Sequence, residues 1–267
     1  MSNATLSLPL PQLRDGKLYA VLAAAGFSLK AVFVKLAYAA GPVDALTLLA
    51  MRMLLALPLF AWLVFSAPAS GQPLQRKQLA HIALLACIGY YLSSLYDFIG
   101  LSYISAGLER LILYVYPTLV LLIGMYFSKQ RSSGKLWQAL AICYSGLLLA
   151  FGNDLQQKSD FSAVLIGGGW IFAAAFVYAL YYLGVAELVG KVGSLRLTGL
   201  AGMFSCGWVL LHFALFGQVS QLQTANAGVW GNALLMALLS TVLPIYWLAL
   251  AIQRLGPGPA AAVGSVG

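Results

Sequence analysis

The sequence predicts an all-α integral membrane protein, built as an inverted repeat of two five-helix bundles. Of its 267 residues, 61% are hydrophobic and only 8% are charged, and the mean hydropathy is +0.88. A soluble domain carries about 25% charged residues, so this composition excludes a soluble fold. Apolar runs recur at the length that a bilayer requires. The two halves of the chain also share their hydropathy spacing, which predicts the repeat.

The apolar runs are separated by short polar breaks, none long enough to hold a soluble domain. We place eight spans at residues 18–38, 45–66, 79–101, 107–127, 137–152, 162–185, 195–217 and 229–251. A ninth begins near Pro257 and is cut off at Gly267. The first run has no small-residue cleavage site close behind it, so we expect a retained helix and not a removed signal peptide.

The positive charges predict the orientation of the chain in the membrane. One set of helix ends carries ten basic residues, namely Arg14, Lys17, Arg76, Lys77, Lys129, Arg131, Lys135, Lys191, Arg196 and Arg254. The opposite ends carry only Lys158. Because short cytoplasmic loops are enriched in Lys and Arg, we expect a cytoplasmic N-terminus in the plasma (inner) membrane. The net charge of +8 does not indicate nucleic-acid binding, since these residues do not gather on one solvated face.

The chain resembles itself at a fixed distance. Moved by 150 residues, "LYDFIGLSYISAGLERLIL" (95–113) falls on "IYWLALAIQRLGPGPAAAV" (245–263), and a shift of 149 places 42–52 on 191–201. Identity is low, but the hydropathy spacing agrees, so each repeat holds five helices. Because five is odd, the second copy enters the membrane from the opposite side, which is a plan used by secondary transporters. Coincidence among apolar segments is the alternative.

Several stretches are similar to the EamA branch of the drug/metabolite transporter superfamily. "SAGLERLILYVYP" (105–117), the basic loop "SKQRSSGK" and "LWQALAICYSGLLLAFG" resemble the first repeat of that family. "KAVFVKLAYAAGP", "LLAMRMLLALPLF" and "LALAIQRLGPGPAAAVGSVG" fit the same pattern, so the resemblance spans residues 17 to 267. It implies ten helices, cytoplasmic termini, a central cavity and transport, often export, of amino acids, other metabolites or toxic compounds.

This resemblance divides the chain into three parts. Residues 1–16 form a cytoplasmic segment, 17–152 the first repeat with helices one to five, and 162–267 an incomplete second repeat. The chain departs from the family at its end, because Gly267 is equivalent to Pro117 in the first repeat. We therefore expect a truncation in helix nine, either of a fragment or of the gene product.

Charged side chains inside the spans mark the candidate site. Each costs about 2.5–3.5 kcal/mol on insertion scales, so its retention requires a reason. Lys30 is expected near mid-membrane, and five others share the outer half of the first repeat: Lys35, Arg52, Asp97, Glu109 and Arg110. We interpret these five as an outer gate or part of the substrate path.

Interface positions remain the alternative for these charges. Long side chains can extend to the lipid headgroups, an interpretation that stays open above all for Lys35. Glu109 also suits the first turn of a helix, where the helix dipole favours an acid by ~0.3–1 kcal/mol. Asp97 and Arg52 are harder to assign to the surface, because each lies a turn or more from its helix end.

Two prolines predict breaks beside a cavity. Pro117 has no N–H and clashes with the Leu113 carbonyl, and Pro244 does the same to Ser240, so both helices should kink. Carbonyls freed at membrane depth must be buried in protein or face a cavity. Hydroxyl-bearing residues on the same helices suit a partly polar, partly apolar substrate: Tyr90, Tyr91, Ser94, Tyr114, Tyr116, Ser240, Thr241 and Tyr246. Their alternative role is to cross-link helices.

The predicted function is a multi-pass permease that exports a small metabolite, amino acid or drug-like compound by alternating access. The alternatives are a channel or a polytopic membrane enzyme, but no HExxH, GxSxG or Gly-Lys-Ser/Thr motif and no filter sequence is present. Three isolated cysteines and two separated histidines predict no metal site, and we expect no cofactor. The expected partners are a small-molecule substrate and the bilayer; coupling to protons and a homodimer are left open.

Overall fold

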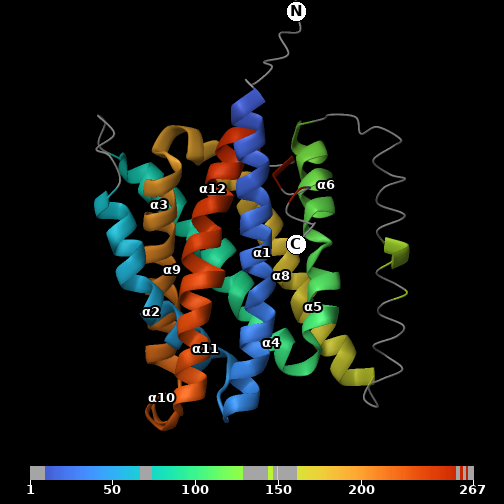
Figure 1. The fold of residues 1–267 in the computed structure, drawn as a ribbon, viewed down its shortest axis with the longest axis vertical. Coiled ribbons are helices and arrows are strands. Elements are labelled where there is room, and N and C mark those ends of the chain that lie inside the picture. The colour runs from blue at the N-terminus through green and yellow to red at the C-terminus, as the bar shows by residue number, and fades with distance from the viewer. Residues whose placement is uncertain are drawn as a thin grey trace, which may run out of the picture.

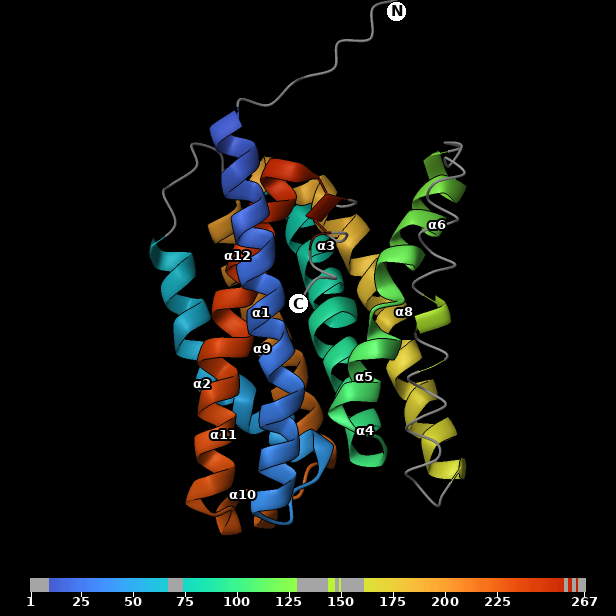
Figure 2. The ribbon, with the colours of Figure 1, turned by 45° about the vertical axis from the view of Figure 1, so that its right-hand side comes forward.

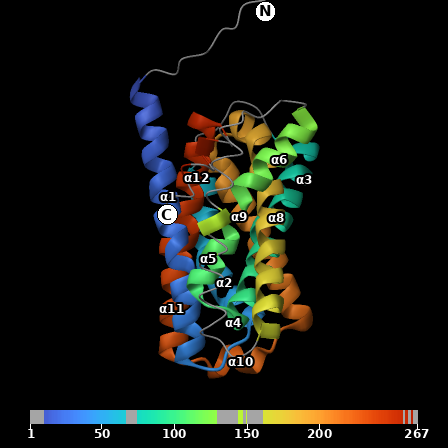
Figure 3. The ribbon, with the colours of Figure 1, turned by 90° about the vertical axis from the view of Figure 1, so that its right-hand side faces the viewer.

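The structure is a computed structural model that describes residues 10–66, 74–128, 144–146, 149, 161–256, 259, 260 and 263. These residues form helices and no strand (Figure 1). Seven helical segments are long and apolar enough to cross a membrane. Figures 2 and 3 show that these segments all run roughly along the long axis of the molecule. The predicted class, an all-α integral membrane protein, is confirmed.

The first half of the chain supplies four of these spans. The first span is α1 (Leu10–Ala40) and the second is α2 (Ala45–Ser66). The third consists of α3 (Arg76–Ala86), the π-helix η1 (Cys87–Leu92) and α4 (Ser93–Tyr103). The fourth consists of α5 (Ala106–Leu113) and α6 (Tyr116–Ser128). The predicted fifth span, 137–152, lies outside the described residues except for 144–146 and 149. Its prediction stays untested.

The second half supplies three spans. The first of them is α8 (Phe161–Val192) and the second is α9 (Ser194–Phe216), which the short α10 (Val219–Thr224) follows. The third consists of α11 (Ala227–Ala237), the π-helix η2 (Leu238–Val242) and α12 (Leu243–Leu255). Several helices extend a few residues beyond the predicted limits, since a helix can continue past the hydrocarbon core. Of the predicted ninth span, only 259, 260 and 263 are described.

The spans pack in two groups that meet at the centre of the molecule. In one group α1 lies against α11, η2 and α12, and α2 lies against α9. In the other, α8 packs against α4, η1, α5 and α6. Contacts of α1 with α4 and α5, and of α2 with α4, join the groups. Segments far apart in the sequence therefore lie side by side, as Figures 1 and 2 show.

Both predicted helix breaks are present. Tyr114 and Val115 form a turn between α5 and α6, directly before Pro117. Before Pro244 the helix widens into η2, and such π-helical turns in α-helices are often found at functional sites. The hydroxyls of Ser240 and Thr241 both donate to the Met236 carbonyl, at 3.1 and 2.8 Å. These bonds tie both hydroxyls to backbone of their own helix beside the widened turn.

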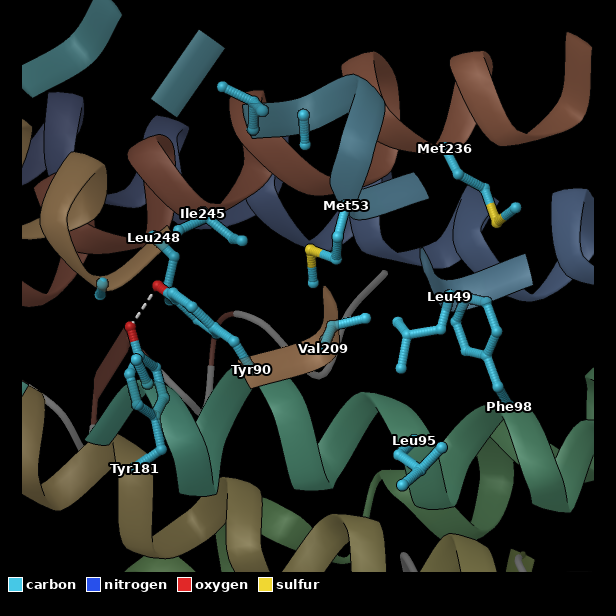
Figure 4. Close-up of a cluster of buried hydrophobic side chains, with 14 of the residues drawn as sticks. Leu49, Met53, Tyr90, Leu95, Phe98, Tyr181, Val209, Met236, Ile245 and Leu248 are labelled. Carbon is cyan, nitrogen blue, oxygen red and sulfur yellow. Dashed lines mark hydrogen bonds between the residues drawn. The ribbon is translucent and has the colours of Figure 1, made fainter. Parts of the chain in front are cut away.

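The inside and outside of the bundle are both apolar. Figure 4 shows part of the interior, where Leu49 and Met53 of α2 lie among side chains from α9, α11 and α12. On the outside, large side chains such as Trp62, Phe65 and Leu215 are 64%, 85% and 67% exposed. A soluble protein seldom exposes so many large apolar side chains in one band, whereas hydrocarbon chains of lipid would cover them.

Candidate functional site

A cavity lies where the two helix groups meet, and its wall combines charged, hydroxyl and aromatic side chains. Its polar lining comes from α1, α2, η1, α4, α5, α6, α8 and η2: Ser28, Lys30, Arg52, Tyr90, Ser93, Ser94, Arg110, Tyr114, Tyr116, Tyr178, Tyr182, Ser240 and Thr241. Apolar residues such as Phe27, Met53 and Leu248 complete the wall. Such a mixed lining is typical of a small-molecule site.

An ion pair between α1 and α4 anchors one side of this cavity. The Lys30 Nζ lies 2.8 Å from the Asp97 Oδ2, and the Asp97 side chain is 1% exposed. Lys30 lines the cavity, whereas Asp97 lies behind it. Pairing is required here, because an isolated charge in this dry environment would cost several kcal/mol.

Glu109 and Arg110 extend the ion pair to the start of α5. The Ser105 hydroxyl accepts a hydrogen bond from the Leu108 N–H and so caps this helix, which fixes Glu109 in its first turn. The Glu109 carboxylate is fully buried, 3.8 Å from the Lys30 Nζ and 3.3 Å from the Arg110 Nε. Arg110 also donates to the Phe27 carbonyl on α1. Two acids and two bases from three helices therefore form one buried cluster.

Arg52 lies on α2 and is held differently. Its Nη2 donates to the Ser94 hydroxyl at 3.0 Å, and its guanidinium carbon lies 4.9 Å from the centre of the Phe98 ring. The side chain is 3% exposed. Its Nε has no hydrogen-bond partner, and no ion pair of Arg52 occurs among the described residues.

Tyrosines of α6 and α8 form the aromatic part of the cavity wall. The ring of Tyr116 lies 5.2 Å from the rings of both Tyr178 and Tyr182, measured between centroids. The hydroxyls of Tyr90 and Tyr181 bond to each other, as the dashed line in Figure 4 shows. These aromatic contacts hold α8 against η1 and α6 beside the cavity.

Several predicted site residues are brought together by this arrangement. Asp97, Glu109 and Arg110 belong to the buried cluster, and Arg52, Arg110, Tyr114 and Tyr116 line the cavity. Because Asp97 and Glu109 are at most 1% exposed, they cannot reach lipid headgroups. Pro117 and Pro244 mark the helix breaks and are not part of the cavity lining. The part that these residues play in transport stays a prediction.

Three other predicted site residues lie elsewhere. Lys35 lines a separate cleft at the end of α1, with Tyr38 and Asp44. The Tyr91 hydroxyl is bonded to the His212 Nδ1 at 2.9 Å and points away from the central cavity. Tyr246 is half-buried and does not line the cavity. These three side chains lie on faces of their helices that do not border the central cavity, because successive positions on a helix point to different sides.

The sequence analysis missed residues that the structure places in the site. Lys30 was assigned a depth near mid-membrane but not a place in the cluster, although it is the partner of Asp97. Tyr178 and Tyr182 were also missed. The sequence "YALYY" carries the signal for them, since tyrosines at i, i+3 and i+4 share one helix face. In the described part of the chain, no group of His, Cys, Asp or Glu could hold a metal ion.

Comparison with known proteins agrees with this architecture. The chain matches the EamA-like transporter family over residues 15–152 and 165–267. It is 30% identical over 259 residues to a Bacillus subtilis (strain 168) protein described as "Uncharacterized transporter YcbK", covering 94% of this chain and 81% of that protein. A solved structure described as "Crystal structure of protein" has a similar fold, with a TM-score of 0.68 at 14% identity, over 94% of this chain and 85% of its own.

The two family matches together span most of the chain. The seven apolar helices also make it a multi-pass membrane protein. The chain therefore belongs to the EamA-like transporter family.

Proposed function

We propose that the protein exports a small molecule across the plasma membrane by alternating access through the central cavity. The observation that carries this proposal is the buried cluster of Lys30, Asp97, Glu109 and Arg110 at the edge of the cavity. A purely structural bundle gains little from four charges at this depth, because each costs free energy to bury. A transporter can use these charges, because ion pairs that are formed in one conformation and broken in another set the relative stability of the two conformations.

The arrangement of helices supports alternating access. Helix α1 begins at the top of Figure 1 and α8 begins at the bottom, so the first helices of the two halves run in opposite directions. The π-helices occupy matching places, since η1 moved by 150 residues overlaps η2 (Leu238–Val242). Both features favour an inverted repeat, whose halves can rock against each other around a fixed site.

Coupling to protons is the part of the proposal that rests on Asp97 and Glu109. Both carboxyl groups lie within 4 Å of the same Lys30 amine, at 2.8 and 3.8 Å. A motion that separates α1 from α4 and α5 would remove this shared cation from both acids. Protonation of one carboxyl would then lower the cost of leaving it buried. Transport driven by a pH gradient, and lost in Asp97→Asn together with Glu109→Gln, is the expected result.

Counterflow into proteoliposomes tests the proposed transport activity. Vesicles that contain the purified chain and an unlabelled metabolite are diluted into the same compound in labelled form, for a panel of amino acids, organic acids and amines. We expect saturable accumulation for at least one class and none in vesicles without protein. An electrical current without saturation would indicate a channel, and chemical conversion of the compound would indicate an enzyme; either result would replace the proposal.

A further inference from the structure

Arg52 is a buried intramembrane charge for which the described residues provide no opposite charge at contact distance. It has a single hydrogen bond, to the Ser94 hydroxyl, and it lies over the Phe98 ring. It is 3% exposed, and its Nε is left without a hydrogen-bond partner. A buried guanidinium normally pairs with a carboxylate or phosphate, whose geometry matches its planar fork. Arg52 therefore supplies the cationic group of an anion-binding site.

Asp97 is near enough to act on Arg52 electrostatically, but neither neighbouring acid makes an ion pair with it. Asp97 is occupied by Lys30 at 2.8 Å, and Glu109 lies between Lys30 and Arg110. Three bases therefore stand against two acids in this part of the protein, so at least one positive charge is in excess. Protonation of either acid would increase that excess.

The excess charge faces the cavity. Arg52, Lys30 and Arg110 all line it, together with the Ser94 hydroxyl that is bonded to Arg52, whereas neither Asp97 nor Glu109 does. A ligand in the cavity therefore meets cations and hydroxyl donors on this side. An amine would be repelled there, and a neutral amide would leave the Arg52 charge uncompensated.

The aromatic and apolar lining sets the character of the rest of the ligand. Tyr116, Tyr178 and Tyr182 present aromatic rings, and Met53, Ile245 and Leu248 add apolar surface. Rings and aliphatic side chains favour an apolar or aromatic body over a strongly hydrated one.

From this geometry we infer that the cavity binds a small monovalent organic anion, whose carboxylate is held by Arg52 with Ser94 and whose apolar or aromatic body lies against the tyrosines. The inference rests on the proposed function, because it names the class of substrate for the same cavity. The carboxylate supplies the charge that Arg52 lacks. With both acids ionised the excess is one positive charge, which a single negative charge neutralises.

Direct binding to the purified protein tests the inference separately from transport. The probes are phenylacetate, 3-phenylpropionate and hexanoate, each compared by calorimetry with its amide and with an amine of the same length. We expect at least one carboxylate to bind roughly 10- to 100-fold more tightly than its amide, the range for a hydrogen bond to a charged group. If no carboxylate binds more tightly than its amide and amine, the inference is wrong.

Three variants locate the binding site. Arg52→Met should abolish the preference for the carboxylate, and Arg52→Lys should retain part of it because the charge remains. Arg76→Gln is the matched control, since Arg76 is exposed at the start of α3 and should leave binding unchanged. An equal preference in Arg52→Met and the unmodified protein would overturn the assignment to Arg52.

Thermal unfolding separates a ligand-binding role from a structural one. Because Arg52 has no ionic partner in the described structure, Arg52→Met should unfold at the same temperature as the unmodified protein or at a higher one. A clear decrease would mean that Arg52 holds the helices together, and it would overturn the inference. Binding of phenylacetate without counterflow would support the anion site while contradicting the proposed transport, whereas counterflow restricted to amines would do the reverse.

Discussion

At the scale of single residues, the contact between Lys30 and Asp97 determines how the charges are kept inside the membrane. The 2.8 Å pair joins α1 to α4, and the Asp97 side chain is almost fully buried. Burying two charges is worthwhile only when each neutralises the other and further hydrogen bonds are present. Removing one partner leaves the other charge uncompensated, which costs more than the pair itself contributes.

Lys30→Gln and Asp97→Asn should each destabilise the protein by about 3–5 kcal/mol, the usual cost of breaking a buried pair. The double variant should lose less than the sum of the two, because neither charge is then left alone. Thermal unfolding in detergent measures the three values. Glu109 lies 3.8 Å from Lys30 and compensates part of the Asp97→Asn loss, so Lys30→Gln is expected to be the more damaging variant.

The pair of Asp15 and Arg254 provides the control for this comparison. Its atoms are 3.2 Å apart, but its side chains are 56% and 31% exposed. Exposed pairs contribute about 0–1 kcal/mol, so Asp15→Asn and Arg254→Gln should be additive. Additive effects at Lys30 and Asp97 as well would show that the buried pair has no special role.

The depth of these charges could be predicted from the sequence, but their pairing could not. Counting residues from the helix ends predicts one shared depth for Asp97, Glu109 and Arg110, and the structure places their side chains in one cluster. The partner on α1 depends on how that helix is rotated. Lys30 and Lys35 are five positions apart, which turns their side chains about 140° from each other around the helix. Lys30 reaches Asp97, whereas Lys35 lines the separate cleft at the end of α1.

At the scale of helices, the two prolines show which local features sequence reasoning can reach. The loss of an N–H and the ring clash are properties of proline itself, so the breaks near Pro117 and Pro244 could be predicted. The π-helix at Cys87–Leu92 has no proline within it and was not predicted. An inserted residue of this kind is set by packing against neighbouring helices. Here η1 lies against α8 and α9, and the sequence predicts these helices as spans but not their packing against η1.

Gly26 should be needed for α1 to approach the widened turn of the last described span. A Cβ at this position would clash with the Pro244 ring and come within 2.9 Å of the Leu239 carbonyl. Gly26→Ala should therefore destabilise the protein by about 1–3 kcal/mol, as overpacking in a close-packed interior usually does. The change in unfolding temperature measures this, and reduced counterflow should accompany it because α1 also carries Lys30.

Gly207 offers a matched control for that substitution. It lies on α9, is exposed, and has open space where a Cβ would be added. Gly207→Ala should be neutral or stabilising by up to about 1 kcal/mol, because alanine favours a helix. If the two alanine variants unfold at the same temperature, close packing of α1 against Pro244 does not contribute to stability.

At the scale of the whole molecule, the distribution of charge agrees with the predicted orientation. The starts of α1, α3 and α9 and the ends of α8 and α12 lie at the same end, the top in Figure 1. Basic residues in these places include Lys17, Arg76, Lys191, Arg196 and Arg254. We expect this end to face the cytoplasm, because positively charged loops are retained there.

Cysteine labelling in intact cells measures that orientation. In a variant without native cysteines, Gln221→Cys on α10 should react with a membrane-impermeant thiol reagent added outside. Lys77→Cys on α3 should react only after the membrane is opened. Both side chains are exposed or partly exposed, so access is limited by the membrane and not by the protein. The reverse pattern would place the N-terminus outside.

Access to the central cavity from both sides is the claim on which the functional interpretation depends most. Ser28 is suited to testing it, because its side chain lines the cavity and its only described hydrogen bond is to the Ala24 carbonyl of its own helix. Ser28→Cys thus changes little else. Cys206 is the internal control, since this buried thiol bonds to the Met53 carbonyl and does not line the cavity.

The decisive measurement is the rate at which a membrane-impermeant thiol reagent modifies Ser28→Cys in right-side-out and in inverted vesicles, with Cys87 and Cys143 replaced by serine. Alternating access predicts modification from both sides, loss of counterflow once the cavity thiol is modified, and no reaction of Cys206. Modification from neither side, or from one side only, would contradict transport through this cavity.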